Sequence, residues 1–440
     1  MALLENKIGS AILSAIRSRR EETPASAIST ANDSPARLRQ AQFSDFAAVA
    51  NLKNRWSMDA DSAENWDRLW RRNPALADRP SAPIGWVLES QSQIVGYIGN
   101  IVLRSHYRGR TLFIAASHGL VVEPAYRAMG VTLISAFYRQ KSIDLYVVTT
   151  AIPPVGKMAR AFKSDAIPQT DYDNVLFWIL RPAPFARSLL KKIGVKSWLT
   201  PVAGPAAALA VTIDRALERR RPRASASDLV VSEIGVSEIG CDFQQLWLDK
   251  LNENPGIIAD RDVATLQWHY SVPGDRGATR VLCCRKNAKL LGYAVIRHEP
   301  ADESNGLRKS IVVDMLVAAD NAAVIEALMV ACYRSAHSAQ SHILELMGFP
   351  RAIREVCQRW RPYVRKYPAC PYFYKAADAE LHKALADPDA WYATPYDGDT
   401  TLIQPSYPTS PFREEMLQAE TPAQSGISTE LAKTPRTAVV

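Results

Sequence analysis

The feature that most constrains the fold of this chain is an internal repeat. Two dipeptides in the first half recur in the second at offsets of 196 and 194 residues, namely Gly96-Tyr97 as Gly292-Tyr293 and Val87-Leu88 as Val281-Leu282. A tryptophan and an Asn-Pro pair precede each copy, as Trp66 and Asn73-Pro74 in the first and as Trp268 and Asn254-Pro255 in the second. A near-constant offset across several features indicates a duplicated structural unit. The chain of 440 residues therefore predicts two similar domains in tandem.

The first copy, residues 37–182, has the pattern of one α/β unit. Short apolar runs bounded by Gly, Pro or polar breaks predict strands, and a spacing of three to four predicts helices. In chain order we expect a helix over 43–56, a β-hairpin over 85–103, a strand over 110–122, a helix over 131–140, a strand over 144–149, a helix over 158–163 and a strand over 174–180. We expect the last of these strands to close the sheet of the first unit.

The second copy, residues 228–400, repeats this order. A hairpin is expected over 278–299, a strand over 310–317 and a helix over 322–335, matching the hairpin, strand and helix of the first unit. Because strands and helices mix in each copy, the predicted fold class is α/β, with α+β mixed sheets in two tandem units.

Three segments lie outside the two units. Residues 1–36 begin with isoleucines and leucines at a spacing of four and predict a short amphipathic helix and a linker. We expect the helix to dock on the protein body, with weak peripheral membrane contact through residues 1–20 as the alternative. Residues 183–227 predict a helical connector ending in the basic run 219–223, which is either solvated or in contact with phosphate or lipid. Residues 401–440, rich in Pro, Ser, Thr and Gln, are expected to form a disordered tail.

Charge and cysteine content narrow the class of protein. The net charge of +8 fits anionic partners such as cofactor phosphates, nucleic acid or acidic lipid. No basic run is interleaved with aromatic residues, so no nucleic-acid partner is expected. Six cysteines show neither C-x-x-C nor zinc-site spacing, so we expect reduced thiols, no metal and a cytoplasmic protein. The apolar run 201–213 is far shorter than the roughly 20 residues of a membrane span.

The segment 118–134 carries the strongest chemical signal in the sequence. An apolar strand ends at Val122-Glu123-Pro124, and a turn containing Arg127 and Gly130 opens directly into an amphipathic helix. Unpaired N–H groups and the dipole at a helix N-terminus favour anions. Glycine lets a ligand approach the backbone closely, and arginine adds positive charge. The segment therefore predicts a cradle for phosphate groups.

This stretch resembles motif A of the GNAT (GCN5-related) N-acetyltransferase superfamily, and the strand over 94–99 resembles the family strand that precedes the motif. In that family the helix-start amides hold the pyrophosphate of acetyl-CoA, and the preceding strand pairs with the pantetheine arm. The resemblance implies that acetyl-CoA or another acyl-CoA is a co-substrate. The positions that match are Leu120, Val121, Val122, Arg127, Ala128, Met129, Gly130, Val131 and Thr132, the last standing where the family has Gly or Ala.

Acyl transfer to an amine needs a group that accepts the amine proton and a donor for the oxyanion. His118 is the first candidate base, because it lies beside the cofactor strand and imidazole titrates near neutral pH. Ser117 and Glu123 are the next candidates, and the resemblance implies a backbone N–H near residues 121–122 as the oxyanion donor.

The family often has a tyrosine acid where this chain has Phe162. Phenylalanine cannot donate a proton to the departing thiolate. The replacement is therefore another tyrosine, with Tyr126, Tyr138 and Tyr146 as candidates, or the thiolate leaves without a dedicated acid.

The second unit lacks the cradle residues. Where the Arg-x-x-Gly turn should recur, the chain reads Asp320-Asn321-Ala322-Ala323-Val324, and the acidic side chain would repel a pyrophosphate. We therefore expect a degenerate second domain. The resemblance implies an enzyme that moves an acetyl or short acyl group from acyl-CoA to a primary amine of a small molecule or amino sugar. The alternative is a non-catalytic acyl-CoA-binding sensor or scaffold protein.

Overall fold

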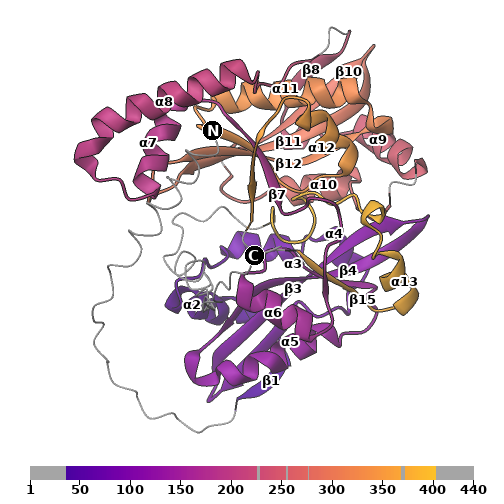
Figure 1. Cartoon of the computed structure of the whole chain (residues 1–440). Helices are drawn as coiled ribbons and strands as arrows, with labels where there is room; N and C mark the ends of the chain where they lie inside the picture. Colours follow the sequence, from indigo (N-terminus) through magenta and orange to yellow (C-terminus); the bar gives the residue numbers. More distant parts are fainter. Residues whose placement is uncertain (1–35, 225–227, 254–255, 276, 368–371, 403–440) are drawn as a thin grey trace, which may run out of the picture.

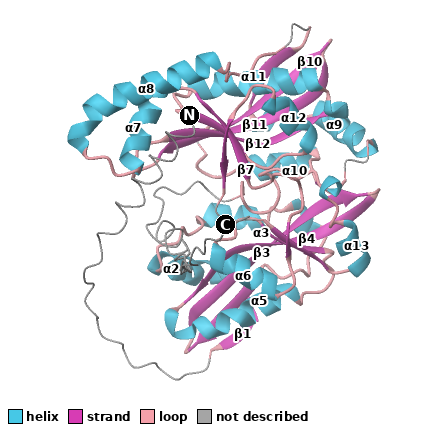
Figure 2. Cartoon of the chain, in the orientation of Figure 1, coloured by secondary structure: helices cyan, strands magenta, loops and turns pink. Residues whose placement is uncertain are grey.

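The computed structural model describes residues 36–402, except 225–227, 254–255, 276 and 368–371. The helix expected in residues 1–20 and nearly all of the tail expected over 401–440 lie outside this part of the chain. The described residues form two mixed α/β halves stacked one above the other (Figure 1), each with helices on its sheet (Figure 2). The predicted fold class is therefore confirmed. Among the described residues, no helix has the length and apolar character needed to cross a membrane.

The first sheet has the strand order β1-β2-β3-β4-β5-β15-β6, and β9 adds to β3 from the side. Its β4 and β5 are parallel, and the other neighbours along this order are antiparallel. The strands are β1 (Arg37–Gln40), β2 (Gly85–Ser90), β3 (Gln93–Tyr107), β4 (Arg110–Val122), β5 (Leu145–Val148), β15 (Phe373–Ala376), β6 (Asp165–Ala166) and β9 (Ile258–Ala259).

The second sheet has the order β8-β10-β11-β12-β13-β7-β14, which repeats the first strand for strand. Here β12 and β13 are the parallel pair. The strands are β8 (Val230–Ile234), β10 (Thr279–Lys286), β11 (Lys289–Ala301), β12 (Arg308–Val317), β13 (Ile343–Leu346), β7 (Asn174–Ile179) and β14 (Tyr363–Lys366). The equal order supports the duplication that the sequence offsets predict.

The two halves exchange a strand. The strand expected to close the first unit forms as β7, but it pairs with β13 and β14 in the second sheet. In return β15, from the end of the second unit, pairs with β5 and β6 in the first sheet, where Figure 1 shows it beside the purple strands. The expectation was wrong because an apolar run marks a buried strand but carries no information about which distant edge it joins.

The helices cover both faces of each sheet. In the first half α2 packs on one side of β3, and α5 packs against β2 and β3 through a separate apolar cluster. In the second half α9 and α11 contact β11 in the same manner. The helices are α2 (Phe46–Arg55), α3 (Ala63–Trp70), α4 (Pro74–Ala77), α5 (Gly130–Tyr138), α6 (Pro153–Ala161), α7 (Pro182–Lys192), α8 (Thr200–Leu217), α9 (Cys241–Asn252), α10 (Val263–Tyr270), α11 (Ala322–Ser338), α12 (Arg351–Gln358) and α13 (Ala379–Ala384).

The helices α3 and α10 meet across the junction of the halves in a nearly symmetric contact. The Arg68 guanidinium donates to the carbonyl of Trp268 (Nη1–O 3.1 Å), and the Trp268 indole donates to the carbonyl of Arg68 (Nε1–O 2.8 Å). Arg68 is buried with carbonyls as its partners, and burial lowers its pKa to about 10. The junction is therefore a packed polar and aromatic interior rather than a loose hinge.

Residues 391–402 run between the halves and are almost completely buried. Tyr392 donates to the carbonyl of Met315 in the second half, and the carbonyl of Leu402 accepts from Arg68 in the first. The expected tail boundary at residue 401 was therefore wrong, because Thr401 and Leu402 are part of the core. Of the cysteines in the described residues, Cys241 is exposed and the other four are buried and unpaired.

Candidate functional site

In the first sheet, the neighbouring strands β4 and β5 pair over only part of their length. The two strands pair from Ile114↔Leu145 to Ala116↔Val147, and β4 then continues alone to Val122. Within the described residues no strand pairs with this edge of residues 117–122. A free strand edge presents backbone N–H and C=O groups that a ligand with amide groups can pair with.

The predicted phosphate cradle lies at the end of this edge, but its turn is tighter than the sequence implied. Residues 124–129 form a 3₁₀ helix, η3 (Pro124–Met129), which runs directly into α5. The Gly130 N–H, expected to be free for a ligand, donates to the carbonyl of Arg127. The Arg127 side chain itself is exposed, as are Ala128, Val131 and Thr132.

Three of the predicted cofactor residues form an apolar strip beside this turn. Leu120, Val122 and Met129 are half-buried and pack against the cluster under α5, whereas Val121 is buried on the opposite face of the sheet. The strip and the exposed Arg127 together offer a surface for a molecule with an apolar arm and an anionic end. The structure thus places Leu120, Val122, Met129 and Arg127 close to one another, and Val121 on the other face of the sheet.

Gly130 has no structural reason to be glycine. Its φ of −55° is ordinary helical geometry, and an added Cβ would meet only Val122 Cγ2 at 3.6 Å. Glycine in a helix is less stable than alanine by roughly 0.5–1 kcal/mol. Neither backbone strain nor crowding therefore requires glycine at this position.

His118 lies next to the open edge, at the centre of a buried polar cluster. It points to the face covered by α2 and α3, and only 4% of its surface is exposed. Its Nδ1 lies 3.3 Å from Asp399 Oδ2, and its Nε2 lies 3.2 Å from Asp61 Oδ2 and 3.5 Å from Lys53 Nζ. Lys53 also donates to Asp61 at 2.8 Å. The imidazole is therefore held from both sides by carboxylates.

Two opposing effects act on this imidazole. Burial and the Lys53 ammonium disfavour its protonated form, but Asp61 and Asp399 outweigh them and raise the pKa of His118 above its ordinary value. Burial also acts against the Asp61 carboxylate, yet Lys53 and His118 hold the pKa of Asp61 well below its usual range. A carboxylate on one ring nitrogen orients the imidazole and stabilises the imidazolium that forms when it takes a proton.

The backbone next to His118 leaves space for the side chain of Lys53. Gly119 has φ of +62°, and an added Cβ would lie 2.8 Å from the Cε and Nζ atoms of Lys53. A side chain at this position would both strain the backbone and displace the ammonium group. The turn after His118 therefore depends on glycine.

The other two predicted catalytic residues lie apart from this cluster. Ser117 points to the opposite face of β4, because neighbouring side chains on a strand alternate. Glu123, at the end of β4, accepts from Arg55 (Nη2–Oε1 2.7 Å) and is partly exposed. The structure thus places His118 beside side chains from other segments of the chain. It does not place His118 beside Ser117 or Glu123.

The tyrosines considered as acids have other partners. Burial raises the pKa of Tyr138, which shares a hydrogen bond with Ser164, and that of Tyr146. The Tyr126 hydroxyl, by contrast, is half-buried on η3 and donates to Ser90. Of the three, Tyr126 lies on the turn that carries the candidate cofactor residues.

Sequence reasoning missed Lys53, Asp61 and Asp399. One signal was available: Lys53 falls on the buried stripe of α2 with Val49 and Leu52, and it recurs 197 residues later as the equally buried Lys250 of α9. Asp399 stands in the turn Asp397-Gly398-Asp399, whose two carboxylates have different roles. Asp397 accepts from the Thr394 N–H, whereas Asp399 reaches His118 and Thr149.

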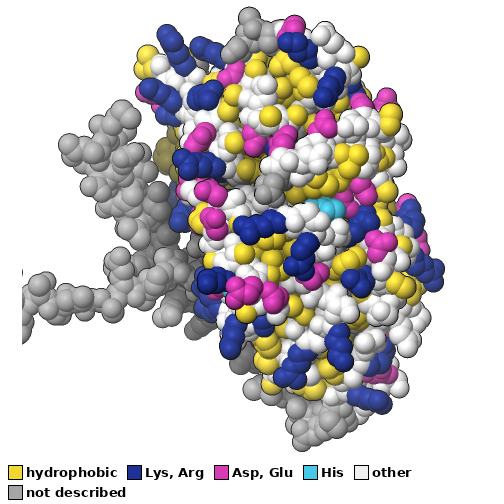
Figure 3. Space-filling view, turned by 90° about the vertical axis from the view of Figure 1, so that its right-hand side faces the viewer, with side chains coloured by type: hydrophobic (Ala, Val, Ile, Leu, Met, Phe, Trp, Pro, Cys, Tyr) yellow, Lys and Arg dark blue, Asp and Glu magenta, His cyan; other side chains and the backbone are white. Residues whose placement is uncertain are grey.

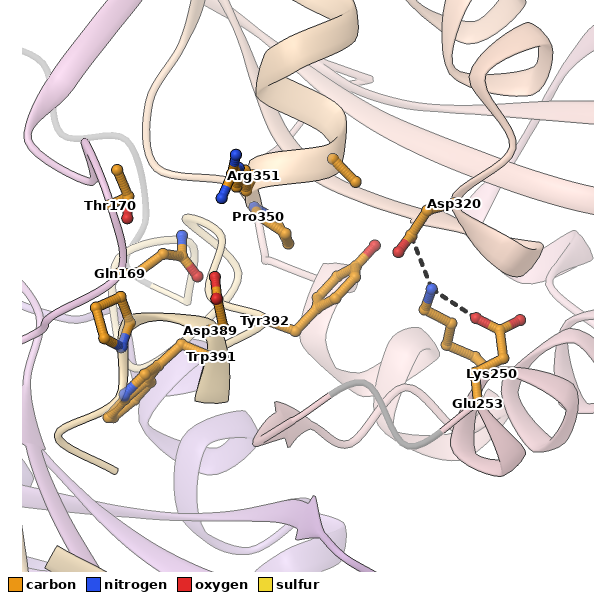
Figure 4. Close-up of a pocket in the computed structure, with 12 residues that line it drawn as sticks. Gln169, Thr170, Lys250, Glu253, Asp320, Pro350, Arg351, Asp389, Trp391 and Tyr392 are labelled. Atoms are coloured by element: carbon orange, nitrogen blue, oxygen red, sulfur yellow. Dashed lines mark hydrogen bonds and ion pairs between the residues drawn. The ribbon is translucent and has the colours of Figure 1, made fainter. Parts of the chain in front are cut away.

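The second half has a pocket of about 190 Å³ (Figure 4). Its walls come from the start of α12, the end of α9, the loop after β12 and residues 388–392. Lys250 Nζ lies 2.8 Å from both Glu253 and Asp320, as the dashed lines in Figure 4 mark. The carboxylate predicted to exclude pyrophosphate is therefore neutralised by an internal lysine instead of facing a ligand. No group of three or more His, Cys, Asp or Glu within the described ranges is arranged to hold a metal ion.

Comparison with known proteins supports the fold. No family model matches the chain, and no curated protein is detectably similar in sequence. Among solved structures, a GCN5-related N-acetyltransferase from Anabaena variabilis ATCC 29413 has 9% identity and a TM-score of 0.50, covering 78% of this chain and 73% of that one. A conserved protein of unknown function from Enterococcus faecalis V583, described as a probable N-acyltransferase, has 9% identity and a TM-score of 0.50, covering 78% and 72%.

A third similar structure is the Saccharomyces cerevisiae N-myristoyltransferase with bound myristoyl-CoA, at 12% identity, a TM-score of 0.47 and coverage of 82% and 90%. The identities are low throughout, so the likeness concerns the fold. The paired sheets, the partial pairing of β4 and β5 and the first two comparisons agree. This chain therefore has the fold of the GCN5-related N-acetyltransferases.

Proposed function

We propose that the first half is an acyl-CoA-dependent N-acyltransferase that moves an acetyl or short acyl group to a primary amine of a small molecule or amino sugar. The observation that carries this proposal is the open edge of β4 at residues 117–122, which leads from the buried His118 cluster to the exposed Arg127. A thioester bound along this edge would lie between a proton acceptor and an anion-binding turn.

Acyl-CoA supplies an activated thioester. The backbone groups of residues 117–122 pair with the amides of its arm, and Leu120, Val122 and Met129 contact the apolar part. Arg127 binds the pyrophosphate. Gly130 adds no side chain at the start of α5, so a phosphate bound by Arg127 can lie close to this turn.

His118 is the proposed proton acceptor. The amine nitrogen attacks the thioester carbonyl, the C–S bond breaks, and the amine proton passes to the imidazole while the sulfur leaves as a thiolate. Asp399 holds Nδ1 and stabilises the imidazolium formed. A backbone N–H near residues 121–122 is the proposed oxyanion donor. His118 then returns the proton to solvent or to the thiolate.

A second candidate function is acyl-CoA binding without turnover, as in a sensor or scaffold protein. The observation that favours it is the closed state of the site: both nitrogens of His118 have carboxylate neighbours, and the Gly130 N–H is already bonded. In that case the cofactor would bind at Arg127 but no amine would be acylated.

The deciding experiment measures thiol release from acetyl-CoA with a panel of amines, together with CoA affinity by calorimetry. We expect Arg127→Glu to abolish CoA binding and turnover. The matched control is Arg110→Glu, an equally exposed charge reversal at the other end of β4, which should retain both. CoA binding without thiol release for any amine would support the binding protein. Full CoA affinity in Arg127→Glu would remove the cradle from this turn.

A further inference from the structure

The helix α8, in the connection between β7 and β8 of the second sheet, has its apolar residues on the outside. The two charged residues in the last turns of α8 face the protein body: Asp214 bonds to the Tyr363 hydroxyl and to Arg220, and Arg215 donates to the Tyr333 hydroxyl (Nη2–Oη 3.1 Å). Its outward face is apolar, with Val202 78%, Leu209 61% and Leu217 76% exposed. A surface helix of a globular protein normally has the reverse arrangement.

The neighbouring helix and turn extend the apolar face. Figure 1 shows α7 and α8 as a hairpin at the left edge of the second half. Of the twelve large apolar side chains that are exposed in the described residues, eight lie in this hairpin: Leu189, Ile193, Trp198, Leu199, Val202, Leu209, Ile213 and Leu217. A cluster of this kind marks a surface that binds a partner or a membrane.

The same hairpin carries nearly all of the net charge of the protein. Residues 182–223 contain nine Lys or Arg and two acidic residues, a net charge of +7 in a chain with +8 overall. Both acids are engaged in ion pairs, Asp214 with Arg220 and Glu218 with Arg361. The exposed cations lie toward both ends of α8 and are Arg187, Lys191, Lys192, Lys196, Arg219, Arg221 and Arg223.

This concentration of charge is local. On the face drawn in Figure 3, which is the right-hand side of Figure 1, basic and acidic side chains are interspersed. The hairpin instead combines an apolar centre with cations around it. Lysine and arginine with long aliphatic stems suit such a border, because they extend to polar groups while their stems cover apolar surface.

A basic groove adjoins the hairpin. It has a volume of about 640 Å³ and is lined by Arg187 and Lys191 of α7, by residues 305–308 and by His342. Four of its lining side chains are Arg, Lys or His, and none is acidic. Burial lowers the pKa of His342, and the nearby arginines, Arg308 among them, act in the same direction. The groove suits an anionic phosphate group.

We propose that the hairpin α7–α8 docks flat on an anionic lipid bilayer. The apolar side chains of α8 enter the boundary between headgroups and acyl chains, Trp198 lies at the headgroup level, and the flanking cations and the basic groove bind lipid phosphates. Each Lys or Arg near an anionic surface strengthens the attraction. This inference concerns a surface separate from the acyltransferase site and does not depend on it.

Charge argues for a bilayer over a second copy of the chain. Two hairpins placed face to face would bring together two surfaces of net charge +7, and like charges repel. An anionic bilayer meets both requirements of the hairpin, since it has an apolar interior and a negative surface. Residues 1–20, the other candidate for a membrane contact, hold four basic residues and one acidic residue, a net charge of +3 against +7 for the hairpin.

The test is co-sedimentation of the full-length protein with two kinds of vesicle. We expect binding to vesicles of phosphatidylcholine mixed with phosphatidylglycerol, no binding to phosphatidylcholine alone, and weaker binding in about 0.5 M salt. The triple variant Trp198→Ser/Val202→Ser/Leu217→Ser should bind about tenfold or more weakly. Its melting temperature should be unchanged, because these side chains have few contacts to lose. The triple variant Lys191→Ala/Lys192→Ala/Lys196→Ala should lose most of the preference for anionic lipid.

The matched control is Val230→Ser/Leu248→Ser/Val364→Ser, which removes three exposed apolar side chains elsewhere and should bind as the wild type does. A full-length variant Ile8→Ser/Ile12→Ser tests the N-terminal segment. If it loses binding while the hairpin variants retain it, the membrane contact belongs to residues 1–20 and the proposal fails. A wild-type dimer that the hairpin substitutions convert to a monomer would make this face a self-interface and would also overturn it.

Discussion

Each half has a buried pair of a basic and an acidic side chain at the same place in the fold. The strand supplies the basic partner in the first half and the acidic partner in the second. In the first half the strand β4 supplies a basic residue, His118, and the loop before α3 supplies the carboxylate Asp61. In the second half β12 supplies the carboxylate Asp314, and the loop before α10 supplies the base Arg261, with Nη2–Oδ1 at 2.9 Å. The buried Arg261 guanidinium stays charged at every ordinary pH, whereas an imidazole between carboxylates can gain and lose a proton. The first half therefore keeps a titratable centre and the second a permanent one.

The charged residues that follow the two matching strands, β4 and β12, also differ in sign. β4 leads to Arg127, whose side chain is exposed, and β12 leads to Asp320, which is paired with the buried Lys250. In the first half the charged side chain faces outward, and in the second it takes part in an internal ion pair. The comparison teaches that a duplicated fold can retain its geometry while the charged groups of the two copies take different places.

The largest effect is expected from removal of the titratable side chain of the first half, His118. We expect His118→Ala to lower turnover per folded molecule by about 10²–10⁴-fold, because general-base catalysis contributes about that much. CoA affinity should change little. In the second half, Tyr293→Phe removes a hydroxyl that donates to the buried Asp314 and should leave turnover unchanged. Equal losses in the two variants would mean that His118 acts only through the fold.

The permanent pair can be broken in the second half. Arg261→Met leaves the Asp314 carboxylate buried without its cation, and removal of one partner of a buried pair typically lowers stability by about 3–5 kcal/mol. Chemical denaturation measures this loss. The control Arg280→Met breaks a half-exposed pair with Glu233 and should lose less than about 1 kcal/mol. A loss in Arg261→Met no larger than in the control would show that this centre does not stabilise the second half.

Gly130, in the predicted phosphate cradle, tests whether the two halves differ in ligand binding at the end of β4. Gly130→Ala should weaken CoA binding about tenfold, or about 1.4 kcal/mol. Stability should rise by about 0.5–1 kcal/mol, since the added Cβ meets only an ordinary contact. Gly204→Ala, in α8, is the control for a helical glycine and should raise stability without any effect on CoA. Unchanged CoA affinity in Gly130→Ala would contradict the proposed approach of the ligand.

The smallest expected effect is on the pH dependence of stability. Two buried histidines, His118 and His269, should change it in opposite directions. The pKa of His118 is raised, so the stability it contributes is present below about pH 6.5 and is lost as pH rises through its folded value. Burial and the cations Arg68 and Arg261 hold the pKa of His269 well below its ordinary value, so His269 lowers stability as pH falls below about 6.5. Relative to the wild type, His118→Gln should be most destabilised at low pH, whereas His269→Gln should gain stability there. Nitrogen chemical shifts of the two rings check the charge states directly, and a neutral His118 at about pH 6 would contradict the assignment.

Local features of the fold were predictable from the sequence. The hairpins and the turn with Arg127 depend on residues that are near one another in the chain, and the repeat at an offset of 196 residues can be seen in the sequence itself. The structure contains each of these elements. The His118 cluster was only partly predictable. Asp61 and Asp399 come from segments 57 and 281 residues away, and nothing in their local pattern indicates a common destination. Their meeting depends on how the two halves pack.

The crossed strands also affect the order in which the protein can be made. The sixth strand of the first sheet, β15, is residues 373–376, so a ribosome has synthesised most of the chain before this sheet can be completed. Until then the edge of β5 is unpaired, and unpaired edges and exposed apolar surface are the features that expose nascent chains to aggregation. The dependence is one-sided: the first half waits for β15, whereas β7 is made before the other strands of the second sheet. A single premature stop near residue 370 would therefore damage the first half, although every residue of that half's own sequence would be present.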